Sequence, residues 1–109
     1  MKLDLFEKAK ADAKKYADEN LEWCLAQPVT EGERIHIVDI AASIIMTRDN
    51  ILQGGGFVEA IIDNNLSQAI SRADSTCIKA LKFFVMVKEN HTEDIFGCIN
   101  LIIQTKLTL

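Results

Sequence analysis

Apolar residues recur at steps of three or four along most of this sequence, and no other feature constrains the fold as much. An α-helix with 3.6 residues per turn brings such positions onto one face. The spacing predicts a helix over residues 4–26, opened by a capping box of Asp4 and Glu7 and ended before Pro28. Its apolar stripe consists of Phe6, Ala9, Ala13, Tyr16, Ala17 and Cys24.

A second capping box, Thr30 with Glu33, predicts a helix that runs to about residue 46. Residues 34–40 also alternate in a way that suits a β-strand. The capping box and the Ala41-Ala42 pair favour the helix. Because this segment is apolar on most sides, we expect it to lie between other elements.

A break is predicted over residues 47–56, because three consecutive glycines cost too much backbone entropy inside a helix. Beyond it the pattern predicts shorter helices. A final helix from Glu93 competes with an extended tail, since residues 99–109 also suit a period of two. The predicted segments after the break are 57–63, an interruption at Asn64-Asn65, 66–73, 75–89 with Asp74 as its cap, and 93–104.

The chain has 109 residues, of which 49% are hydrophobic, enough for one core and too few residues for two. We therefore expect a single all-α domain over 1–109, a compact bundle of four to six helices with a possible short extended C-terminal tail. So small a domain has little interior for this many apolar side chains. Some apolar surface is expected to be covered by a second copy or by a partner.

Charge and cysteine content indicate which partners and which cellular compartment suit this chain. The net charge is −4 and no segment is basic, so nucleic acid is an unlikely partner on electrostatic grounds. Three cysteines, Cys24, Cys77 and Cys98, lie within apolar runs and suit a reduced core better than disulfides. The N-terminus has no apolar leader, and no apolar run reaches the ~18 residues that span a bilayer. These features predict a cytoplasmic protein that does not enter the membrane.

The glycine triplet places free backbone N–H groups at a predicted helix N-terminus, a geometry that can hold an anion. It lacks the lysine and hydroxyl of a P-loop, and the sequence favours a flexible turn that lets two helices pack closely. Several polar residues, including Asp63, follow the triplet. One interpretation is that they cap helices and that Arg72 forms a salt bridge with Asp74. The other is that they face a partner or a small anionic ligand. The candidate binding residues are Arg48, Gly54, Gly55, Gly56, Asn64, Asn65, Arg72 and Asp74.

Catalytic chemistry is not expected. The two histidines, His36 and His91, have no cysteine or acid at metal-ligand spacing, and neither sits beside a paired nucleophile. We expect His36 to be a core or interface imidazole and His91 to be solvated. The sequence thus predicts no catalytic residue, no metal ligand and no cofactor.

One stretch resembles a known protein family. Residues 55–66, GGFVEAIIDNNL, followed by 67–74, SQAISRAD, are similar to small uncharacterised proteins of tailed bacteriophages. In that family a glycine pair and an aromatic precede A-x-x-x-N-(D/N)-L and then A-x-x-R-A-D. The resemblance covers about residues 49–87; Leu52-Gln53 replace a proline pair often found there, and the last segment lacks the family's tryptophan. It implies a phage origin and no particular chemistry.

Three functional hypotheses follow. The leading one is a phage accessory protein that binds and inhibits a host defence or replication protein in the host cytoplasm. The second is an oligomer that sequesters a nucleotide signal, using the Gly54–Gly56 amides with Arg72 or Arg48. The third is a structural homo-oligomer.

Overall fold

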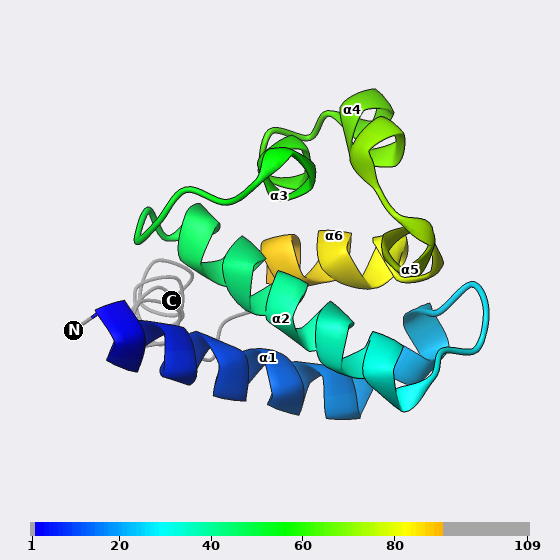
Figure 1. Cartoon of the computed structure of the whole chain (residues 1–109), viewed down its shortest axis with the longest axis horizontal. Coiled ribbons are helices and arrows are strands. Elements are labelled where there is room, and N and C mark those ends of the chain that lie inside the picture. Colours follow the sequence, from blue (N-terminus) through cyan, green and yellow to red (C-terminus); the bar gives the residue numbers. More distant parts are fainter. Residues whose placement is uncertain (1, 91–109) are drawn as a thin grey trace, which may run out of the picture.

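The computed structural model describes the backbone of residues 2–90 and the side chains of residues 5–89. Within that range it contains six helices and no strand, which confirms the predicted all-α class (Figure 1). The predicted final helix or extended tail, with His91 and Cys98, lies outside the described residues. The helices are α1 Lys2–Cys24, α2 Glu31–Arg48, α3 Gly56–Ile62, α4 Leu66–Arg72, α5 Ser75–Lys79 and α6 Leu81–Asn90.

The two long helices form an antiparallel pair, and α2 is the central element. α1 lies along one side of α2, while α3, α5 and α6 contact α2 from the other directions (Figure 1). The α1 face toward α2 is built mainly from alanine, which allows close approach of the two backbones. Its buried residues are Ala9, Ala13, Ala17, Leu21 and Cys24.

The central position of α2 agrees with its apolar sequence, although its buried stripe differs from the predicted one. Ile37 and Ile44 are fully buried, whereas Ile35, placed in the stripe by the spacing, is 54% exposed. The capping box at the start of α2 is confirmed: Thr30 Oγ1 accepts from the Glu33 amide, and Glu33 Oε1 accepts from the Thr30 amide. The alternative strand over residues 34–40 is not formed.

Two aromatic side chains of α6 pack in the core. Phe83 and Phe84 are both fully buried, and each complete burial of such a side chain stabilises the fold by roughly 1.5–3 kcal/mol. The Phe83 ring lies 5.7 Å from that of Tyr16 on α1, and the Phe84 ring meets Phe57 of α3 edge-on at 5.5 Å. These contacts join α6 to both α1 and α3.

Two predicted helix boundaries are wrong. α1 begins at Lys2, so Asp4 lies within the first turn and is not the residue preceding the helix. The segment predicted as one helix over 75–89 is two, α5 and α6, separated at Ala80. The carbonyl of Lys79, which a continuous helix would use internally, instead accepts a hydrogen bond of 2.9 Å from the backbone amide of Ala26. Tertiary packing therefore breaks the helix where the sequence has no glycine or proline.

The interruption predicted at Asn64-Asn65 is confirmed. Asn64 adopts a left-handed backbone with φ 58°, and the Asn65 side chain caps α4 by accepting from the Gln68 amide. Among the described helices none is both long and apolar enough to cross a membrane.

Candidate functional site

The glycine triplet borders a polar pocket of about 430 Å³ between the loop before α3 and the helix α4. Of the candidate residues, the structure brings together Gly54, Gly55, Gly56, Asn65 and Arg72 in its wall. Gln53, Glu59, Asp63 and Gln68 complete the polar lining.

Close packing explains Gly54, because a Cβ there would lie 2.6 Å from Val58 Cγ1 and 2.9 Å from Thr47 Oγ1. At Gly56 a Cβ would meet the exposed Arg72 side chain, which can move, and at Gly55 it would meet nothing within 4 Å. None of the three has a positive φ, so close approach at Gly54 is the reason that the structure gives for a glycine in this loop.

The charge of this pocket does not suit an anion. Two carboxylates, Glu59 and Asp63, face one guanidinium, that of Arg72. Arg72 already donates from Nε to Gln68 Oε1 at 3.1 Å. A phosphate group would therefore meet a net negative wall, which opposes its binding.

Arg48 does not reach this pocket, which corrects the expectation from the sequence. Its guanidinium contacts the carboxylate of Asp49 at 3.0 Å and donates to the backbone carbonyls of Val87 and Lys88 in α6. Arg48 thus fastens the last residue of α2 to the backbone of α6.

Asn64 and Asp74 also lie elsewhere. Asn64 points its side-chain oxygen at Lys88 Nζ, away from the glycine loop. Asp74 caps α5 and forms no salt bridge with Arg72, in contrast to the ion pair considered from the sequence. Its carboxylate instead contacts a histidine.

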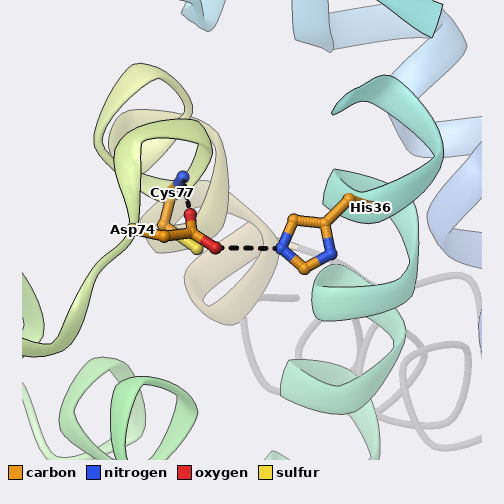
Figure 2. Close-up of side chains that lie close together, drawn as sticks. All are labelled: His36, Asp74 and Cys77. Atoms are coloured by element: carbon orange, nitrogen blue, oxygen red, sulfur yellow. Dashed lines mark hydrogen bonds and ion pairs between the residues drawn. The ribbon is translucent and has the colours of Figure 1, made fainter. Parts of the chain in front are cut away.

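That contact forms a second cluster, which sequence analysis missed. His36 of α2 lies 3.2 Å through Nε2 from Asp74 Oδ2, and Asp74 Oδ1 accepts a hydrogen bond of 2.8 Å from the Cys77 amide (Figure 2). One ligand atom from each of the three side chains lies within 4.8 Å of the others. His36 is not a core imidazole as one expectation had it, since its side chain is 48% exposed. Its expected place in an interface stays a prediction. Only Asp74-x-x-Cys77, with its helical spacing, was visible in the sequence.

The electrostatics of this cluster differ from those of a cysteine nucleophile. Burial raises the pKa of Cys77 to about 12, and the hydrogen bond and negative charge of Asp74 act in the same direction. The hydrogen bond from the Cys77 amide lowers the pKa of Asp74. A reactive cysteine needs a lowered pKa and a neighbouring positive charge. Here the imidazole faces the carboxylate, so the thiol stays protonated at neutral pH.

A third feature is an apolar surface on α4 and α6. Leu66, Ile70 and Val85 are 59%, 47% and 40% exposed, unusually high values for large aliphatic side chains. Leu66 and Val85 border a pocket of about 120 Å³ whose floor includes Ala60, Ile61 and Ala69. Ile70 follows Leu66 by one helical turn, on the same side of α4. We call Leu66, Ile70, Val85 and this pocket the Leu66 surface.

Another groove lies between the two long helices, α1 and α2. Its volume is about 330 Å³, and Ala11, Ile35 and Val38 form its apolar part. Charged side chains of both signs surround it, namely Glu7, Lys10, Lys14, Glu31 and Arg34. Only one large aliphatic side chain here, Ile35, is strongly exposed.

Residues 49–87, for which the sequence suggested a resemblance to phage proteins, span the glycine loop, α3, α4, α5 and most of α6. They therefore include both the polar pocket and the Leu66 surface. Compared with models of protein families, with curated proteins and with solved structures, the chain matches none of them.

Proposed function

We propose that this protein acts by binding another protein through the Leu66 surface. The observation that carries the proposal is the exposure of three large aliphatic side chains, two of which, Leu66 and Val85, line one small pocket. Burying them against a partner removes apolar area from water, which is the main driving force of association. The pocket has the size and apolar lining to receive one side chain of the partner as an anchor.

The predicted excess of apolar residues supports this reading. A short helix such as α4, with seven residues, buries only Ala69 in the described fold and leaves both Leu66 and Ile70 in solvent. In the described fold these two side chains are only partly removed from water. A partner that covers α4 would give them a role.

The biological setting proposed from the resemblance is a phage accessory protein in the cytoplasm of its host. Such a protein would bind and inhibit a host defence or replication protein by covering its working surface. The stretch that carries the resemblance contains Leu66, Ile70 and Val85, so the proposed origin and the proposed binding surface coincide in the chain. Occlusion requires no catalytic group.

Sequestration of a nucleotide signal receives less support. The pocket beside the glycines carries Glu59 and Asp63, and Arg48 is directed to α6. A nucleotide phosphate would meet more negative than positive charge there. A homo-oligomer that pairs through the Leu66 surface is the remaining alternative, and oligomeric state distinguishes it from a partner of different sequence.

A photoreactive amino acid placed at position 66 tests the proposal. Irradiation in host lysate should cross-link the full chain to one protein, which mass spectrometry identifies. The matched control carries the same group at position 35, whose side chain is exposed to a similar extent on α2. Light scattering on the purified chain reports self-association separately. Cross-linking to a protein of another sequence from position 66 alone supports the proposal; equal products from both positions, or none, contradict it.

A further inference from the structure

We propose that His36, Asp74 and Cys77 form a binding site for a zinc ion that joins α2 to the start of α5. His36 comes from α2, whereas Asp74 and Cys77 come from the start of α5, and the three side chains lie close together (Figure 2). His36 and Asp74 are exposed and Cys77 is buried. Their ligand atoms are an imidazole nitrogen, a carboxylate oxygen and a sulfur, all three of which zinc accepts.

The spacing of the ligand atoms suits a tetrahedral ion. Zinc–ligand bonds of about 2.0–2.3 Å place neighbouring ligand atoms of a tetrahedron roughly 3.3–3.6 Å apart. His36 Nε2 and Asp74 Oδ2 are 3.2 Å apart, and all three ligand atoms lie within 4.8 Å of one another. A small rotation of exposed side chains closes the remaining gap, because His36 and Asp74 are about half exposed.

Asp74 can bind the ion without giving up its structural role. Its Oδ1 accepts the hydrogen bond from the Cys77 amide that caps α5, while Oδ2 is directed at His36. The cap also fixes the first turn of α5, in which Cys77 is the third residue. Two of the ligands are thereby held in place before the ion arrives, which lowers the entropic cost of binding.

The carboxylate of Asp74 places negative charge beside the buried Cys77 side chain, which favours a cation there. When zinc binds, the zinc–sulfur bond forms as the S–H bond breaks, and the proton passes to solvent. Water can occupy the fourth position on the exposed side.

Oxygen-preferring ions fit less well. Magnesium and calcium take six or more oxygen ligands, and the cluster offers one carboxylate among its three groups. The mixed nitrogen, sulfur and oxygen set therefore selects zinc or its spectroscopic substitute, cobalt(II).

Titration of the full chain with Zn²⁺ and with Co²⁺ tests the site. Binding of Zn²⁺ should saturate at one ion per chain and raise the thermal midpoint, because the ion binds only the folded state. Co²⁺ should give a sulfur-to-cobalt charge-transfer band in the near ultraviolet. His36→Gln should weaken binding by more than about a hundredfold, the upper range for loss of groups that only orient a ligand. Cys77→Ala should abolish the band.

The matched controls are Cys24→Ala and Cys98→Ala, which remove the other two cysteines and should leave both binding and the band unchanged. If circular dichroism shows that Cys77→Ala does not fold, His36→Gln decides the question, since its side chain is about half exposed. Failure of the full chain to bind Zn²⁺ saturably, unchanged affinity in His36→Gln, or a band that disappears with Cys24 or Cys98 would overturn the proposal.

Discussion

The carboxylate of Glu33 joins two helices, because its Oε2 lies 3.0 Å from Lys79 Nζ on α5 while its Oε1 caps α2. The same Oε2 accepts a hydrogen bond of 3.0 Å from Thr76 Oγ1. The backbone hydrogen bond from Thr30 is the main cause that lowers the pKa of Glu33 to about 2, followed by the bonds from Lys79 and Thr76.

This pKa predicts a specific acid sensitivity. A carboxyl whose pKa is lower in the folded than in the unfolded state adds stability above its unfolded pKa, near 4.5. That contribution is lost as the pH falls from about 4.5 toward 2. Glu33→Gln keeps a capping side chain but cannot ionise. Urea midpoints measured across this range should fall more steeply for the wild type than for Glu33→Gln; parallel curves would refute the assignment.

The glycine loop allows a matched comparison of two substitutions. Gly54→Ala should destabilise the fold by about 1–3 kcal/mol, because its Cβ would overlap the branched side chain of Val58. Gly55→Ala should have little effect or stabilise slightly, because its Cβ enters open space and φ is negative. Denaturant unfolding of the two variants measures the difference. Equal stabilities would show that the loop is not packed as described.

The left-handed backbone at Asn64 predicts a different pair of effects. Asn64→Ala should cost about 1–2 kcal/mol more than Asn64→Gly, because a Cβ is unfavourable at φ 58°. Both substitutions remove the contact with Lys88, so the difference between them isolates the backbone term. Thermal unfolding of both variants provides the comparison, and a more stable alanine variant would contradict the conformation.

Local sequence signals were sufficient to predict most of the helices. The Thr30–Glu33 capping box, the Asn64-Asn65 interruption and the Asp74 cap depend on residues within four positions of each other. The separation of α5 from α6 could not be predicted, because it depends on the bond from Ala26 to Lys79, 53 positions along the chain (79 − 26). A tertiary contact therefore divides the segment that the sequence predicted as a single helix over residues 75–89.

The sites show the same limit. Gly54–Gly56 and Arg72 share a pocket, as their closeness in the sequence suggested, while Arg48 donates to the carbonyls of Val87 and Lys88 in α6 instead. His36 and Asp74 lie 38 residues apart and meet only because α2 packs against the start of α5. The exposure of Leu66 also could not be predicted, since its spacing matches that of a buried helical stripe.

The affinity of the protein cross-linked through position 66, measured for three versions of the full chain, tests the central claim most directly. Leu66→Glu places a charge in the centre of the proposed interface and should weaken binding by at least about thirtyfold, the loss expected at a dominant interface residue. Ile35→Glu places the same charge on an equally exposed position of α2 and should bind like the wild type. Equal affinity of Leu66→Glu and the wild type, or a comparable loss in Ile35→Glu, would contradict binding through the Leu66 surface.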